Sequence, residues 1–159
     1  MQPNMQAMAF QDQIPNNACF GCGPDNHQGL RIRSYWDGAD AVCLFMPEPH
    51  HSAGPASILN GGIIASIIDC HCVGTAIAQL YRVEDRPIGS TPTIWCATGS
   101  LTVNYLRPTP IDKPVLLRAH IVETKPKKVT LRCSLWSGEL ECANAEVIAV
   151  RVPDTWRSD

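Results

Sequence analysis

The sequence predicts an α+β domain in which one long buried helix lies against a sheet of about five or six mostly antiparallel strands. Three observations support this class. A long apolar segment without proline, near the middle of the chain, has helical spacing. Strand-like segments lie on both sides of it, and those that follow it are separated by stretches typical of hairpin turns. A helix and consecutive strands of this kind form two layers, with the helix covering one sheet face.

Length and composition favour one globular domain. The chain has 159 residues, of which 45% are hydrophobic and 18% are charged, which excludes a disordered chain. A formal net charge of −2 argues against a dedicated nucleic-acid-binding protein. The first basic residue is Arg31, and the best apolar run, 63–68, is too short to span a bilayer. We therefore expect a cytoplasmic protein without a membrane partner, made of a loosely ordered arm (1–18) and one domain (19–159).

A loop and a pair of strands are predicted before the helix. Residues 19–29 contain many turn-forming residues and are expected to form a structured loop. The strands are predicted at 30–36 and 41–46, joined by the turn at 37–40. A loop rich in Pro, His, Ser and Gly follows at 47–57 and leads into the helix.

The helix is predicted over residues 58–81. Asn60 is a suitable N-cap residue, and Gly61 and Gly62 lie in the first turn, where the backbone can approach a ligand. Apolar residues then recur at helical spacing as far as residue 81. Because the apolar arc is wide, most of this helix must be buried.

The last third of the chain is predicted to be rich in strands. Thr98, Ser100 and Asn104 alternate with apolar residues, as expected for a strand with two different faces. Proline residues end this strand. The later strands are expected at 115–123, 129–136 and 140–152.

Asp69 is the unusual residue of the helix. It lies about 120° around the helix from the middle of a polar stripe formed by His71, Thr75 and Gln79, and its own neighbours are small and apolar. A carboxylate in such surroundings is costly unless it is paired or takes part in chemistry. A surface aspartate, or a buried one that accepts backbone hydrogen bonds, is the structural alternative.

The start of the helix favours the chemical interpretation of Asp69. The amides of Gly61 and Gly62 are unpaired at a helix N-terminus, carry partial positive charge and suit a developing oxyanion. The Asp69 side chain lies about two turns further on and tilts back toward this end. We therefore expect the amides and the carboxylate to face one region, an arrangement that suits attack on a carbonyl group.

Three segments resemble one protein family, the PaaI-like acyl-CoA thioesterases of the hotdog fold. The segment 60–69 (NGGIIASIID) resembles the His-Gly-Gly…Asp segment of that family, with the acidic residue at the same spacing. The segment 19–30 (CFGCGPDNHQGL) resembles the Cys-x-x-Cys-Gly…Asn…Gly-Leu segment of one branch. The segment 98–108 (TGSLTVNYLRP) resembles the central strand and its Tyr-x-Arg-Pro end. The resemblance covers about residues 19–152, with the helix and the strands in the same order.

The resemblance implies a fold, an assembly and a reaction. In that family a curved antiparallel sheet wraps the central helix, and two subunits pair their sheets so that two active sites lie at the interface. The resemblance therefore implies a homodimer or homotetramer that hydrolyses an acyl-CoA. Coenzyme A is part of the substrate, and no cofactor is expected.

The resemblance also implies roles for individual residues. Asp69 would be the nucleophile or general base, and a backbone N–H of Gly61 or Gly62 would polarise the thioester carbonyl. Thr98 matches a Ser or Thr that the partner subunit's strand contributes, often to hold the water. Asn60 stands where many members have His; it can donate a hydrogen bond but cannot shuttle a proton. The predicted substrate contacts are Ser66, Ser100 and Asn104.

Two other functions remain open from the sequence. The first is a non-catalytic acyl-CoA or lipid-binding module of the same fold, in which Asn60 marks the loss of chemistry. The second is a hotdog dehydratase or hydratase, a chemistry that typically uses a His at the start of the helix, where this chain has Asn60.

The eight cysteines are expected to be reduced thiols, most of them in the core. Cys19 and Cys22 form a Cys-x-x-Cys pair, with Cys70, His71 or Cys72 as conceivable further metal ligands. Structural zinc needs four ligands and usually a second close pair, so we expect no metal. A redox disulfide between Cys19 and Cys22 is a weak alternative, because the thioredoxin-like context is missing.

Overall fold

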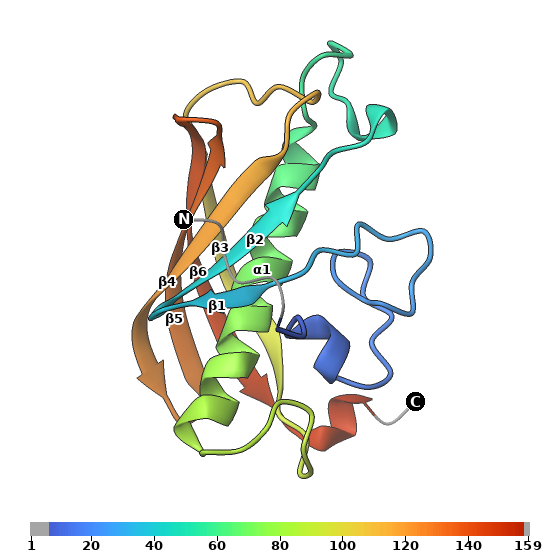
Figure 1. The fold of residues 1–159 in the computed structure, drawn as a ribbon. Helices are drawn as coiled ribbons and strands as arrows, with labels where there is room; N and C mark the ends of the chain where they lie inside the picture. The colour runs from blue at the N-terminus through green and yellow to red at the C-terminus, as the bar shows by residue number, and fades with distance from the viewer. Residues whose placement is uncertain (1–6, 158–159) are drawn as a thin grey trace.

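The structure, a computed structural model, describes residues 7–157 and consists of one long helix and one curved sheet (Figure 1). This arrangement confirms the predicted α+β class and the hotdog architecture. The elements are η1 (Gln11–Gln13), β1 (Tyr35–Asp37), β2 (Asp40–Phe45), η2 (Pro49–His51), α1 (Gly61–Val83), β3 (Trp95–Tyr105), β4 (Val115–Lys125), β5 (Lys128–Ser137), β6 (Leu140–Val152) and η3 (Asp154–Arg157).

The six strands form one antiparallel sheet with the order β1-β2-β4-β5-β6-β3. Strands β4, β5 and β6 follow one another as a meander, whereas β3, which follows the helix, lies at the edge beside β6. The sheet curves around α1 (Figure 1). One edge of β3, an 11-residue strand, therefore has no neighbouring strand within the described residues.

The core lies between α1 and the concave face of the sheet. Fully buried residues of the helix meet inward-pointing residues of the central strands; they include Ile67, Ile68, Cys72, Ala76, Leu117, Leu131, Val147 and Ala149. By length and composition α1 is also apolar enough to cross a membrane, but most of it is buried within this fold.

Asn60 is the N-cap as predicted, although the helix was predicted from residue 58 and begins at Gly61. The Asn60 side-chain oxygen accepts hydrogen bonds from the Gly62 amide at 2.7 Å and from the Ile63 amide at 3.3 Å. This N-cap satisfies two of the otherwise unpaired amides of the first turn. The helix continues to Val83, two residues beyond the predicted end.

The N-terminal segment (residues 7–34) is better ordered than predicted. The arm was expected to be loosely ordered up to residue 18, but Phe10 and Ile14 are buried in the core. The Gln11 side chain is buried too, and it accepts a hydrogen bond from the Ser34 amide and donates one to the Ser34 hydroxyl. This segment covers the side of α1 that the sheet leaves open (Figure 1). Residues 1–6 of the predicted arm lie outside the described residues.

The first predicted strand is shorter than expected for a related reason. Only Tyr35–Asp37 pairs with β2, whereas residues 30–34 form hydrogen bonds with Phe10, Phe20 and Gly21. The Leu30 amide donates to the Phe20 carbonyl at 2.7 Å, and the Ile32 amide donates to the Gly21 carbonyl at 3.2 Å. The extended conformation was predicted correctly, but its hydrogen-bond partner is a loop and not a strand.

Candidate functional site

Asp69 and Thr98 meet between α1 and β3. The Thr98 hydroxyl donates a hydrogen bond of 2.7 Å to one oxygen of the half-buried Asp69 carboxylate. Burial raises the pKa of Asp69, and the hydrogen bond from Thr98 partly offsets this rise. Within residues 7–157 the second carboxylate oxygen has no hydrogen-bond partner. It is therefore free to take a proton from water or to attack a substrate.

This carboxylate lines a small, mostly apolar cavity of about 140 Å³. Three parts of the chain form its wall: α1 with Asp69, Val73 and Ile77, the start of β3, and the N-terminal segment. An apolar cavity with a few polar groups is typical of a site for a small ligand. The position of Asp69 thus meets both conditions for a chemical role, a reactive group and room beside it.

The start of the helix offers one free amide. Of the two glycine amides that the sequence proposed, that of Gly62 donates to Asn60. The Gly61 amide has no hydrogen-bond acceptor among the described residues, while the Gly61 carbonyl accepts a hydrogen bond of 2.6 Å from the Tyr105 hydroxyl. Gly61 is therefore the candidate donor to an oxyanion, and Tyr105 fixes its peptide. Sequence reasoning did not assign Tyr105 this role, although the Tyr-x-Arg-Pro segment had drawn attention to it.

The structure corrects the expectation that this amide and Asp69 of one chain face one region. Gly61 and Asp69 are eight residues apart on an uninterrupted helix, which corresponds to about 12 Å along its axis. The backward tilt of a helical side chain covers only about one turn. A carbonyl oxygen must lie about 3 Å from its donor, so one thioester cannot contact both groups of the same chain.

The structure also corrects the expected origin of Thr98. The resemblance placed this residue on the partner subunit's strand, but its hydroxyl contacts Asp69 of the same chain. The cause is a β-bulge between Thr98 and Ser100, where β3 pairs with β6. The bulge inserts Gly99, so that Thr98 lies opposite the buried Ala149 and shares the helix-facing side of the sheet.

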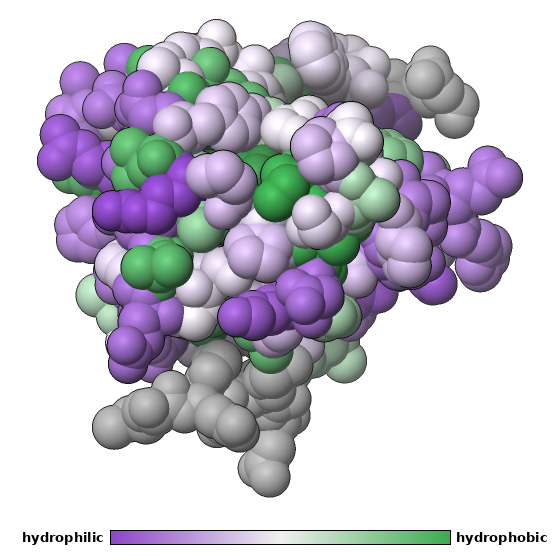
Figure 2. Space-filling model, turned by 90° about the horizontal axis from the view of Figure 1, so that it is seen from above, coloured by the Kyte–Doolittle hydropathy of each residue, from purple (hydrophilic) through white to green (hydrophobic). Residues whose placement is uncertain are grey.

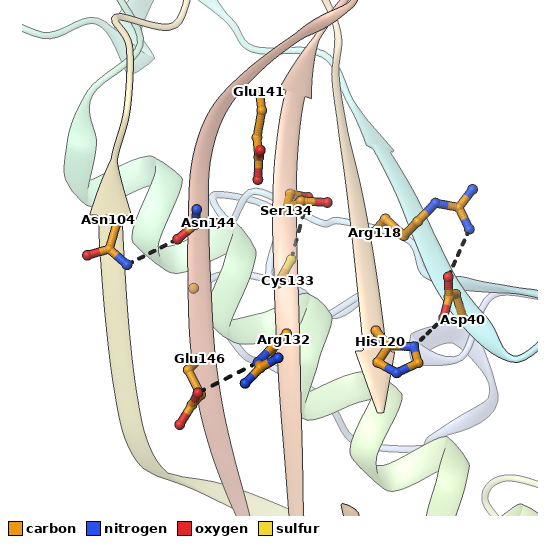
Figure 3. A pocket seen from close by; sticks show the side chains of 11 residues that line it. Asp40, Asn104, Arg118, His120, Arg132, Cys133, Ser134, Glu141, Asn144 and Glu146 are labelled. Carbon is orange, nitrogen blue, oxygen red and sulfur yellow. Dashed lines mark hydrogen bonds and ion pairs between the residues drawn. The ribbon is translucent and has the colours of Figure 1, made fainter. Parts of the chain in front are cut away.

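Ser100 and Asn104 lie on the other face of the sheet, away from Asp69. Ser100 is opposite Ile148, and the Asn104 side chain donates a hydrogen bond of 3.0 Å to Asn144. Figure 3 shows Asn104 and Asn144 on this outer face, with the helix behind the sheet. Without the bulge, strict alternation would have placed Thr98 on the same face as these two residues. The structure thus separates these two predicted substrate contacts from the predicted catalytic group.

Ser66, the remaining predicted contact, lies on α1 three residues before Asp69. Its hydroxyl donates a hydrogen bond of 2.9 Å to the Gly62 carbonyl within the helix. This position is half-buried and on the side of the helix that faces the N-terminal loop, because the Ser66 carbonyl lies beside Gly21. Ser66 is therefore near the cavity but is not among the residues that line it.

The outer face of the sheet has a more open hollow of about 500 Å³ (Figure 3). Most of its charged side chains are paired with one another. Arg118 and His120 both contact Asp40, and Arg132 lies 3.9 Å from Glu146. Exposed pairs of this kind are common on protein surfaces. The carboxylate of Glu141 also lines the hollow and has no partner among the described residues (Figure 3). The hollow is a weaker candidate for a site than the smaller cavity beside Asp69.

Comparison with known proteins agrees with this architecture. A hotdog domain with a carboxylate in the middle of its helix is the class that the geometry defines. A family model described as the thioesterase superfamily matches residues 56–143, and the chain belongs to this family. The family resemblance noted in the sequence is thereby confirmed.

Individual relatives support the assignment. The chain is 28% identical over 109 residues to acyl-coenzyme A thioesterase THEM4 of Xenopus laevis, a match that covers 69% of this chain and 43% of that protein. The chain thus spans less than half the length of this curated relative. The crystal structure of a thioesterase superfamily protein from Shewanella loihica PV-4 is 34% identical, with a TM-score of 0.62, and the match covers 77% of this chain and 91% of that one.

A more distant structure shares the fold. The PaaI protein of the E. coli phenylacetic acid degradation operon is 14% identical, with a TM-score of 0.63, over 78% of this chain and 81% of that one. At this level of identity the similarity concerns the arrangement of helix and strands.

Proposed function

We propose that the protein hydrolyses an acyl-CoA thioester, with Asp69 as the nucleophile or general base. The observation that carries the proposal is the half-buried Asp69 carboxylate, which has one oxygen held by Thr98 and the other free beside an apolar cavity. Membership of the thioesterase superfamily supports hydrolysis of a thioester, and the name of the Xenopus laevis relative supports acyl-CoA as the substrate class.

The chemistry needs few groups. Asp69 takes a proton from water as the water oxygen adds to the thioester carbon, or it attacks that carbon itself and forms an anhydride that water then cleaves. In either route the carbonyl oxygen becomes an oxyanion, which collapses and expels the thiolate of coenzyme A. A thiol has a pKa of about 8.5, so the thiolate leaves without prior protonation. Asn60, which cannot donate a proton as an acid, is compatible with this reaction.

The site is complete only if a second copy of the chain supplies the oxyanion donor. The helix separates Gly61 from Asp69 of its own chain by about 12 Å. The 11-residue β3 has one edge without a neighbouring strand among the described residues, and the half-exposed Tyr105 and Leu106 lie at its end. Figure 2, which looks onto the end of the molecule where α1 begins, shows apolar residues among polar ones there. We therefore propose a homodimer that places Gly61 of one copy near Asp69 of the other.

The first experiment measures release of free thiol from a panel of short, long and aryl acyl-CoAs. Asp69→Asn keeps the acceptor for the Thr98 hydroxyl but removes the charge, and we expect kcat to fall about 100- to 10,000-fold. Asp85→Asn is the matched control, because Asp85 is exposed in the loop after α1. Equal turnover of Asp69→Asn and wild type would disprove the mechanism. Binding of acyl-CoA without any hydrolysis would favour the non-catalytic module.

A mixing experiment tests the shared site. Gly61→Pro removes the candidate amide at the first helical position, which tolerates proline, and Asn60 already has the extended conformation that a following proline requires. Gly61→Pro and Asp69→Asn should each be inactive. After the two variants exchange subunits, the mixture should recover about a quarter of wild-type activity, since half of the dimers are mixed and each of these holds one intact site out of two. No recovery in mixed dimers would place the whole site in one chain.

A further inference from the structure

Three cysteine sulfur atoms converge beside the catalytic carboxylate. The Sγ atoms of Cys19, Cys22 and Cys70 all lie within 4.8 Å of one another, and those of Cys19 and Cys70 are 3.6 Å apart. Cys19 and Cys22 come from the loop of the N-terminal segment, while Cys70 follows Asp69 on α1. All three thiols are free.

We propose that Cys19, Cys22 and Cys70 form a three-thiolate binding site for a thiophilic d¹⁰ cation, best matched by Zn²⁺. A tetrahedral zinc ion with Zn–S bonds of about 2.3 Å holds its sulfur ligands about 3.8 Å apart. The spacing of the three Sγ atoms fits this geometry with little movement. A disulfide would join two of the sulfurs and leave the third without a role.

The loop is built to bring these sulfurs together. A side chain at Gly21 would overlap the Cys70 sulfur, and a side chain at Gly23 would overlap the backbone of Cys19. The Gly23 amide closes the turn with a hydrogen bond of 2.8 Å to the Cys19 carbonyl. Both glycines are therefore required by close approach, as in a tight turn that presents two cysteines to one ion.

Asn17 supports the cluster from outside. Its side-chain oxygen accepts a hydrogen bond of 3.1 Å from the Cys19 amide, and its side-chain nitrogen lies 3.8 Å from the Cys22 sulfur as a donor. Hydrogen bonds of this kind orient metal-binding side chains and stabilise their charge. Asn17 is itself buried, so the contacts are held within the fold.

A cation would bind the three sulfur atoms as thiolates. It would displace their protons and distribute the negative charge over three ligands.

The fourth coordination position would open into the cavity beside Asp69. Within residues 7–157 no fourth Cys, His, Asp or Glu atom joins the group. Of the other ligands considered from the sequence, His71 has both ring nitrogens hydrogen-bonded, and Cys72 is fully buried against Cys133. Cys19, Cys22 and Cys70 line the same cavity as Asp69, so water or a small ligand would complete the coordination. The cation would fasten the N-terminal segment to the helix and fix one wall of this cavity.

The test is metal binding by the reduced full chain, purified without a histidine tag and stripped with a chelator. We expect one Zn²⁺ per chain by elemental analysis, a rise in Tm on adding Zn²⁺, and a thiolate-to-metal charge-transfer absorption with Co²⁺. Cys19→Ser, Cys22→Ser and Cys70→Ser should each weaken Zn²⁺ binding at least 10-fold. Cys142→Ser, at a buried cysteine on β6 outside the cluster, should not change it.

Titration of the wild-type chain with Zn²⁺ and Co²⁺ decides the proposal even if a serine variant fails to fold. Absence of stoichiometric Zn²⁺ and Co²⁺ binding by the reduced wild type would overturn it. So would a spectrum without sulfur-to-cobalt charge transfer, or a purified protein whose Cys19 and Cys70 are joined by a disulfide that forms in preference to metal binding. None of these measurements depends on thioesterase activity, so they are independent of the proposed function.

Discussion

Asp69 and His71 are two residues apart on α1, and the structure uses them in different ways. The His71 ring is fully buried, with Nδ1 2.8 Å from the Ser34 hydroxyl and Nε2 3.2 Å from the Ala41 carbonyl. Burial lowers its pKa to about 4, although the contact with Ala41 opposes this, so the ring is neutral at pH 7. Asp69 has one hydrogen-bonded oxygen and faces a cavity.

The difference separates a polar residue with a structural role, His71, from the residue proposed for catalysis, Asp69. The two side chains are about 200° apart around the helix. They therefore lie on nearly opposite sides of it and have different surroundings. His71 occupies a position where every polar atom has a partner, and its role is to connect α1 with β2 and the N-terminal segment. Within the described residues Asp69 retains an unpaired oxygen at the wall of a cavity, an arrangement that costs stability and that supports the catalytic role proposed for it.

Asp69→Asn should have the largest effect: a large loss of activity without a loss of stability. Activity should fall as described above, while the free energy of unfolding should not decrease, because the variant no longer holds a charge in a half-buried apolar site. Urea unfolding of the variant and of wild type, alongside the thiol-release assay, checks this. A loss of stability as large as the loss of transition-state stabilisation would assign Asp69 a structural role.

His71→Ala should show the opposite pattern. It leaves a cavity and removes a partner from the buried Ser34 hydroxyl, and we expect it to lower the free energy of unfolding by about 2–4 kcal/mol. The kcat of the molecules that remain folded should change little. Urea unfolding measures the first effect, with His27→Ala at an exposed loop position as the control. Full stability of His71→Ala would contradict the proposed contrast.

Thr98→Val should reduce activity by a smaller amount. Valine has nearly the same shape but cannot donate a hydrogen bond to Asp69, a contact to a charged group worth about 1.5–3 kcal/mol. We expect kcat to fall about 10-fold or more, with KM less affected. Thr98→Ser retains the hydroxyl and should keep most of the activity. If both variants behave alike, the hydroxyl has no part in the reaction.

Asn60→Ala should have the smallest effect, and mainly on stability. It removes the cap that accepts the amides of Gly62 and Ile63, at a cost of about 1 kcal/mol. Because the departing thiolate needs no acid, kcat should remain within a few-fold of wild type. Asn60→Ser, which also caps a helix, should restore the stability. A kcat loss in Asn60→Ala that Asn60→Ser does not repair would assign Asn60 a direct contact with the substrate.

Local patterns in the sequence were sufficient for several features. The α+β class, the helix and its start at Asn60, and the later strands follow from period, capping and turn residues, which act between neighbours in the chain. Asp69 could be singled out in the same way, since a carboxylate among small apolar residues is visible on a helical wheel. The polar stripe of His71, Thr75 and Gln79 was also visible, but the burial of His71 and Thr75 was not.

Other features depend on contacts between distant parts of the chain, and only the tertiary structure decided them. The bulge at Gly99 places Thr98 beside Asp69 and turns Ser100 to the other sheet face, a result of pairing with β6 that the alternating sequence conceals. The close approach of Cys70 to Cys19 joins residues 51 positions apart. Sequence periodicity records which face a residue presents within its own element, whereas these positions depend on the packing of that element against others.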